Sequence, residues 1–217
     1  MATDISFQLE FRNKRFNAAS KGLAAFAKEL SASWDGSAQV LSSELKDFLQ
    51  SVAQALADRH SSPWPGGTGK QTLSRRSGNL TASILGSVRV EGTAWANIEG
   101  HIAAAFPGVV HEYGATIRPK SAKFLTVPLP AALDGRGVPL KRSARDWQHT
   151  FVAKSRAGNL IIFQRRGSSV VPLYVLKTEV KIPPRLGMRT TLDAGIPYFV
   201  DRAADQVVKA MLKGASA

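Results

Sequence analysis

One stretch of the sequence, GVVHEYGATIRPK at residues 108–120, places side chains that could transfer protons or bind a metal next to one another. His111, Glu112 and Tyr113 are adjacent, and they begin like the zinc-binding pattern H-E-x-x-H. That pattern needs a second histidine on the same helix face, and Ala115 stands at its position. We therefore expect no metal site at this stretch.

Because the stretch lacks a second metal ligand, we expect its residues to have structural roles. We expect His111 to be a polar group at the end of a strand or helix, and Glu112 to be the partner of a nearby cation. Tyr113 should be a half-buried ring. Gly114 should stand where the chain turns, since glycine adopts turn conformations without a steric penalty.

Two further motifs resemble sites but lack their spacing. The segment GTGK at residues 67–70 has no G-x-x-x-x-G-K-S/T pattern, because Gln71 follows the lysine. Ser77 stands beside Gly78 without the G-x-S-x-G turn of a serine nucleophile. The acidic residues show no paired-carboxylate spacing. We expect no catalytic residue, cofactor or metal, and hence no enzyme. A small hydrolase that uses Ser77 or His111 is the third interpretation, after the two functions that are given at the end of this subsection.

The positive charge is concentrated in one part of the chain. The sequence has 217 residues and a net charge of +13, from 29 basic and 16 acidic side chains. Residues 1–60 hold seven of each sign, whereas Arg118 to Arg189 hold 15 basic and three acidic residues. Such a surface suits a polyanion such as DNA, or an acidic protein neighbour.

Other features of the composition exclude several classes of protein. The absence of cysteine removes disulfides, thiolate nucleophiles and the usual structural zinc sites. No apolar run reaches the length of a membrane span, and the first residues carry Asp4 and Glu10 rather than an apolar segment. We expect no membrane partner, and a protein that stays in the cytoplasm or in an assembly made there.

Hydrophobic periodicity predicts a strand and then helices in residues 1–60. Apolar residues alternate with polar ones over residues 4–11, which is the period of a half-buried strand. From about residue 17 to residue 60, apolar residues recur at helical spacing. Trp34, Asp35, Gly36 and Ser37 interrupt this pattern. We expect two helices or one broken helix, with Asp35 or Ser37 as the second N-cap.

Loops and strands are predicted in the middle of the chain. Residues 61–73 should form a flexible loop, and SGNLTASILGS at 77–87 a short amphipathic segment. Six strand-like runs follow: SVRVEG, TAWANIEG, KFLTVPL, HTFVAK, NLIIFQRR and VVPLYVLKTEVKI. Two of them should form a hairpin turning at Ser155 to Gly158. The loop at 130–147 is basic, and such a loop is usually functional or disordered until bound.

The end of the chain predicts a closing helix over 189–213, kinked or broken at Pro197. The fold class is therefore α+β. Amino-terminal helices should pack on a mostly antiparallel, sandwich-like β-sheet, followed by the carboxy-terminal helix. We expect one domain over residues 1–217, with a β-rich part at 74–188.

Three motifs, in this order, resemble the tail-completion and virion-morphogenesis proteins of tailed bacteriophages. The first motif, S-G-N/R-L, is matched by Ser77, Gly78, Asn79 and Leu80. The third motif, a proline-rich segment P-x-R-P-F-L before the last helix, is matched only in part, by Pro183, Pro184 and Arg185, because RLGM replaces R-P-F-L. The resemblance spans about residues 73–213. The second motif is matched by Glu112, Tyr113, Gly114, Ile117, Pro119, Ala122, Lys123 and Pro128.

The resemblance implies a non-enzymatic virion protein at the neck or tail terminus, acting in tail completion and head–tail joining. It implies a self-assembled ring, a hexamer first and a dodecamer as the alternative. Its partners would be neck, connector and tail-tube proteins, with DNA passing non-specifically through the lumen. The ring lumen or an acidic neighbouring ring should be contacted by Arg118, Lys120, Lys123, Arg136, Lys141, Arg142 and Arg145.

Two other readings of the basic residues stay open. They can form an ordinary solvated face. The protein can also be a free nucleic-acid-binding protein that uses its basic carboxy-terminal part, although it has no helix-turn-helix, zinc-finger or similar signature.

Overall fold

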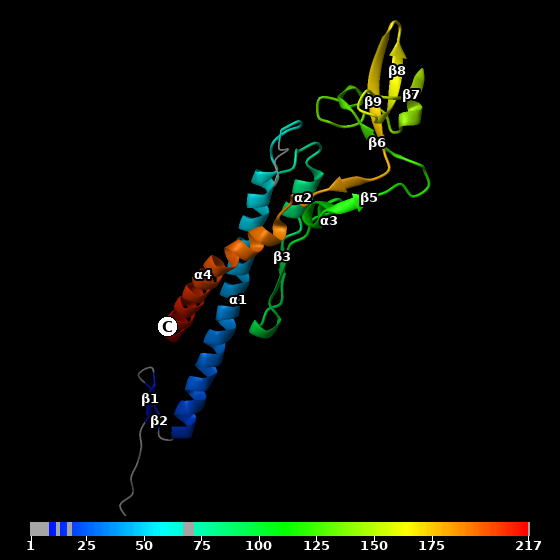
Figure 1. The fold of residues 1–217 in the computed structure, drawn as a ribbon. Coiled ribbons are helices and arrows are strands. Elements are labelled where there is room, and N and C mark those ends of the chain that lie inside the picture. The colour runs from blue at the N-terminus through cyan, green and yellow to red at the C-terminus, as the bar shows by residue number, and fades with distance from the viewer. Residues whose placement is uncertain (1–8, 12–13, 17–18, 67–71, 217) are drawn as a thin grey trace, which may run out of the picture. The chain divides into compact units, whose positions relative to one another are not determined.

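The computed structural model describes residues 9–11, 14–16, 19–66 and 72–216. Its longest elements are two helices, α1 (Ala19–Arg59) and α4 (Met188–Ser216) (Figure 1). All pairings between named strands are antiparallel. The predicted α+β class is therefore confirmed. Within the described residues, no helix has an apolar stretch suited to crossing a bilayer.

The contacts of the chain fall into two compact units. The first contains Met1–Gln50, Val88–His101 and Asp193–Ala217, and the second contains Ser51–Ser87 and Ile102–Leu192. Both long helices contribute residues to both units.

In the first unit, α1 runs without interruption through the predicted break. Gly36 is exposed there and meets no neighbouring atom, so the helix tolerates it. The Ser37 hydroxyl donates to the Trp34 carbonyl at 2.6 Å, which satisfies the buried hydroxyl within the helix. The prediction of two helices or a broken one is therefore wrong, because these breaker residues form no competing cap.

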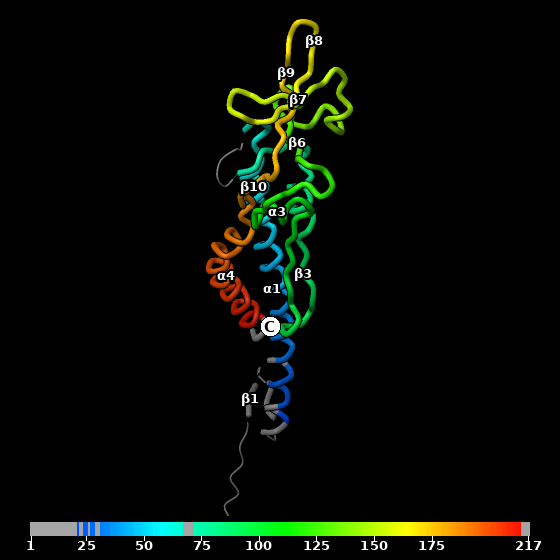
Figure 2. The backbone as a smooth tube through the Cα atoms, turned by 45° about the vertical axis from the view of Figure 1, so that its right-hand side comes forward, coloured from blue at the N-terminus to red at the C-terminus, as the bar shows by residue number. Residues whose placement is uncertain are grey.

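A short hairpin packs along α1 in the same unit (Figure 2). It consists of β3 (Arg89–Glu91) and β4 (Glu99–His101), joined by a 3-10 turn over Trp95–Asn97. The rings of Trp95 and Trp34 lie 4.9 Å apart, and the Trp95 indole donates to the Trp34 carbonyl at 3.1 Å. The strand predicted across TAWANIEG is wrong at Trp95–Asn97, since the Asn97 side chain accepts two backbone N–H groups and closes a turn.

The later part of α4 belongs to the first unit and packs on α1. Phe199 stacks on Phe48 with ring centroids 4.9 Å apart, and Arg202 pairs with Glu44 at 2.7 Å. The predicted closing helix is confirmed and begins at Met188. It continues through Pro197, so the predicted break does not occur.

The second unit contains a four-stranded sheet with the order β6-β9-β8-β7. The hairpin predicted at Ser155 to Gly158 is confirmed, and the Gly158 N–H donates to the Ser155 carbonyl at 2.9 Å. Ala132, Ala144, Leu173 and Tyr174 form a buried cluster on this sheet. The strands are β6 (Leu125–Pro128), β7 (Thr150–Lys154), β8 (Leu160–Arg166) and β9 (Ser169–Lys177).

Short elements complete the described chain. The short amphipathic segment expected at 77–87 contains the helix α2 (Asn79–Leu85), and α3 (Gly108–Tyr113) was not predicted. Residues 61–66 and 72–73 form no helix or strand, as expected, while 67–71, with the GTGK motif, lie outside the described residues. Of the strand predicted at 4–11, residues 4–8 also lie outside them. The remaining pairs are β1 (Leu9–Phe11) with β2 (Lys14–Phe16), and β5 (Ala115–Ile117) with β10 (Val180–Ile182).

Two helical glycines provide a matched test of the packing in the first unit. A Cβ at Gly36 meets no atom within 4 Å, whereas a Cβ at Gly195 would lie 2.6 Å from the Phe48 ring. We expect Gly36→Ala to raise the free energy of unfolding by about 0.5–1 kcal/mol. Gly195→Ala should lower it by about 1 kcal/mol, because the methyl group displaces the Phe48–Phe199 stack. Urea denaturation measures both, and equal stabilisation by the two substitutions would contradict the packing of α4 on α1.

Candidate functional site

The seven cations predicted as contacts are all exposed. Two of them have acidic partners: Arg118 pairs with Glu179 at 2.9 Å, and Arg136 lies 3.7 Å from Asp134. Lys123 lies over the Phe124 ring, with Nζ 5.6 Å from its centroid. No acidic side chain among the described residues pairs with Lys120, Lys141, Arg142 or Arg145. Their charge is available to an external anion.

The loop at 130–147 is held in place by its own hydrogen bonds rather than being an irregular chain. The Asp134 carboxylate accepts the backbone N–H groups of Arg136 and Val138, at 2.8 and 2.9 Å. These bonds, the one from Val138 above all, lower the pKa of Asp134. At the other end of the loop, Ser143 and Asp146 form a reciprocal cap.

Apolar contacts fasten the same loop to the sheet. Ala132 and Ala144 are buried, and the Trp147 indole donates to the Tyr174 hydroxyl at 3.1 Å. The loop therefore presents Lys141, Arg142 and Arg145 from a fixed backbone.

His111, Glu112 and Tyr113 lie in α3. Within the second unit, this helix forms hydrogen bonds with the segment before α4 and with the first residues of α4. The His111 carbonyl accepts the N–H groups of Arg185 and Leu186, at 2.6 and 2.9 Å. The Glu112 carboxylate accepts the N–H groups of Met188 and Arg189, at 2.8 and 2.9 Å. Those two N–H groups open α4, so Glu112 caps that helix and places negative charge at its positive end.

Of the expectations for Gly114 and Tyr113, one is confirmed and the other is wrong. Gly114 has φ of 74°, and a Cβ there would lie 2.9 Å from the Ile182 carbonyl oxygen, so the predicted turn is confirmed. The half-buried ring predicted at Tyr113 is wrong, since that residue is 70% exposed. It lies at the end of a helix of only six residues, with its ring on the outer face.

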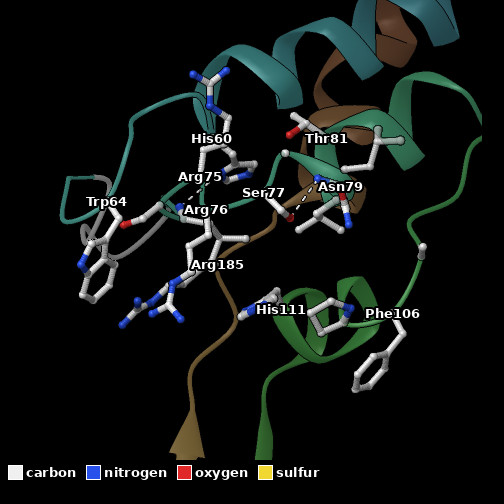
Figure 3. A pocket seen from close by; sticks show the side chains of 17 residues that line it. His60, Trp64, Arg75, Arg76, Ser77, Asn79, Thr81, Phe106, His111 and Arg185 are labelled. Carbon is white, nitrogen blue, oxygen red and sulfur yellow. Dashed lines mark hydrogen bonds between the residues drawn. The ribbon is translucent and has the colours of Figure 1, made fainter. Parts of the chain in front are cut away.

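A cavity of about 570 Å³ opens beside α3 in the second unit. Three arginines line it, and none of the described aspartates or glutamates does. Arg75 and Arg76 precede α2, and Arg185 precedes α4; Figure 3 shows the side chains of Arg76 and Arg185 extending to the same side of the cavity. The Arg76 guanidinium lies over the Trp64 ring, 4.5 Å from its centroid. We call this cavity the arginine pocket.

Two histidines also line the arginine pocket. Leu73 N–H donates to His60 Nδ1 at 3.1 Å, so the neutral ring carries its proton on Nε2, 3.0 Å from the Leu186 carbonyl. Burial lowers the pKa of His60, and the nearby Arg59 adds to this. Burial, then Arg185 and His60, lower the pKa of His111. Both rings are held neutral in a positive environment.

The sequence alone does not reveal the arginine pocket. Arg75 and Arg76 stand just before the SGNL motif, and Arg185 belongs to the third motif, but their joint location depends on tertiary structure. The adjacent arginines, Arg75 and Arg76, were the sequence feature that could have indicated an anion-binding site. Within the described residues, no cluster of three potential ligands for a metal ion occurs.

The neutral state of the two histidines predicts a pH dependence of stability. Because folding lowers both pKa values, the unfolded chain binds more protons once the pH falls below 6.5. We therefore expect the free energy of unfolding to fall as the pH is lowered from about 7.5 to about 5.5. A double variant, His60→Gln with His111→Gln, should lose less stability over this range in urea titrations. An undiminished loss would show that other groups cause it.

The cap of α4 predicts a contrast between two glutamates. Glu112→Ala leaves two helix-opening N–H groups without their acceptor and should lower the free energy of unfolding by about 1–2 kcal/mol. Glu179→Ala removes a solvent-exposed ion pair and should change it by less than about 0.5 kcal/mol. Thermal and urea unfolding compare them, and equal effects would argue against the cap.

Comparison of the chain with protein-family models, with curated proteins and with solved structures finds no match.

Proposed function

We propose that the protein is a structural component of a tailed-bacteriophage virion. In this proposal it acts in tail completion and head–tail joining, as a ring around the DNA path at the neck or tail terminus. It is not an enzyme, and its partners are copies of itself, DNA and neighbouring neck, connector or tail-tube proteins.

One observation carries the proposal: parts of the three motifs that resemble this family lie together in the second unit. The SGNL residues of the first motif line the same cavity as Arg185 of the third. Gly114 of the second motif lies against Pro184 of the third, and the strands beside them, β5 and β10, pair. Motifs that match a family by chance have no reason to be in contact, so their convergence supports the resemblance.

Exposed apolar side chains support a role in assembly. Phe106 is 84% exposed, and Tyr113 and Tyr198 are each 70% exposed. Val152 and Val170 of the four-stranded sheet are also about half exposed, at 55% and 49%. Large apolar groups of this kind commonly mark protein–protein contacts, and a closed ring would cover them through one repeated interface.

The basic loop supplies the charge that the proposed role requires. Lys141, Arg142 and Arg145 project from a backbone that is already ordered, so they contact DNA or an acidic neighbour without first ordering the loop. The same three cations also favour the second candidate, a free nucleic-acid-binding protein. In that case a monomer would bind duplex DNA tightly, and the affinity would fall steeply with added salt.

Particles made without the protein test the main proposal. Electron microscopy of a lysate from the encoding phage with this gene deleted should show full heads separated from finished tails if the protein joins them. Tails of abnormal length would assign it to tail termination instead. Intact, infectious particles would contradict both roles. Light scattering on the purified protein measures its oligomeric state, and a salt-sensitive complex of monomer with free DNA would favour the second candidate.

Charge reversal tests the loop separately. A variant with Lys141→Glu, Arg142→Glu and Arg145→Glu should fold normally, because these side chains are exposed, and should lower the yield of joined particles at least about tenfold. Complementation of the deletion phage measures that yield. A control with Lys154→Glu, Arg156→Glu and Lys177→Glu makes the same change in charge elsewhere on the sheet. Equal yields from both variants would exclude a specific role for the loop.

A further inference from the structure

The arginine pocket concentrates positive charge that no acidic group on its walls compensates. Arg75, Arg76 and Arg185 line it together with two histidines, and none of the three arginines has an acidic partner among the described residues. Cations of a solvated surface are usually interspersed with acids, whereas these line one cavity of about 570 Å³. That volume lies in the range of small-molecule sites.

Two nitrogen atoms on the wall of the pocket lack a hydrogen-bond partner in the described structure. Arg185 Nε and His111 Nδ1 are both buried and unpaired. A buried polar group without a partner is destabilising, and such groups are rare in folded proteins. Both atoms are covered by surrounding protein, so they are local defects of the pocket wall and the ligand is expected to contact other atoms of the arginine side chains.

The walls also restrict the position of the charges. Arg76 is held over the Trp64 ring, which leaves the edge of its guanidinium for hydrogen bonding. The backbone of Arg185 is fixed by its N–H, which donates to the His111 carbonyl at 2.6 Å. Arg76 therefore loses less side-chain freedom when a ligand binds, and Arg185 enters the pocket from an ordered backbone.

We propose that the arginine pocket binds a phosphate group. A phosphate carries close to two negative charges and several acceptor oxygens, which matches more than one guanidinium fork at once. A single carboxylate would leave most of the charge of the pocket uncompensated. The lowered pKa of His111, caused in part by Arg185, is consistent with this excess of positive charge.

This site is separate from the cations of the basic loop and does not depend on the proposed virion role. The phosphate can belong to a small molecule or to a DNA end. The apolar and aromatic side chains on the walls, Leu73, Leu80, Ile84 and Phe106, leave room for the uncharged part of such a ligand.

Binding of pyrophosphate tests the proposal on the full-length protein. Isothermal titration at low salt should show saturable binding, and pyrophosphate should raise the melting temperature. Arg185→Met and Arg76→Gln should each weaken binding at least about tenfold, since each removes a charge-assisted hydrogen bond. Arg156→Gln removes the same charge from the exposed β7–β8 turn and should leave binding unchanged.

A stability readout separates a lost site from a lost fold. Arg185→Met keeps the length of the side chain but removes the unpaired Nε donor, so without ligand its melting temperature should equal or exceed that of the wild type. Pyrophosphate should then stabilise the wild type and Arg156→Gln but not Arg185→Met. If Arg185→Met does not fold, Arg76→Gln carries the same comparison, because Arg76 is exposed.

Two oligonucleotides identify the source of the phosphate. A short single-stranded DNA with a 5′-phosphate that binds more tightly than its 5′-hydroxyl form, and loses that advantage in Arg185→Met, would identify a DNA end. Binding of pyrophosphate with no such advantage would identify a small phosphorylated ligand. The proposal is overturned if pyrophosphate does not bind, or if Arg185→Met, Arg76→Gln and Arg156→Gln all bind it as the wild type does.

Discussion

The short segment from Arg185 to Arg189 is held from three directions, and both the start of α4 and the arginine pocket depend on it. The His111 carbonyl accepts two of its N–H groups, and Glu112 accepts two more. His60 at the end of α1 contacts the Leu186 carbonyl, and Leu186 itself is only 1% exposed. Because these bonds satisfy backbone groups that the ends of β10 and α4 leave unpaired, the chain can change direction inside the unit.

The same junction gives the HEY stretch at residues 111–113 a structural role. His111 contributes mainly its backbone carbonyl, and Glu112 uses both carboxylate oxygens on one helix end. Each of its carboxylate oxygens therefore accepts one of the N–H groups that open α4. The adjacent Gly114 is required because a Cβ would collide with the strand that leads into the junction.

Two groups of cations remain available to external anions, and they differ in physical character. The cations of the basic loop are solvent-exposed and act by long-range attraction, which salt screens. Of the pocket arginines, Arg75 and Arg76 are exposed and Arg185 is partly buried, so attraction is strengthened and screening weakened mainly at Arg185. The first group suits a non-specific polyanion, and the second suits one defined anionic group.

The sequence by itself determined most local elements of the fold. Alternating and helical periodicities predicted strands β6 to β9, the Ser155–Gly158 turn and the closing helix, because these signals depend on neighbouring residues. It failed at Gly36 and Ser37, where residues that often interrupt a helix form no competing cap and α1 continues. Only the tertiary structure decided the role of Glu112 and the meeting of Arg76 with Arg185. Glu112 and Met188 are 76 positions apart, and the arginines of the pocket also come from distant segments. Local sequence patterns do not indicate which distant residues fold together.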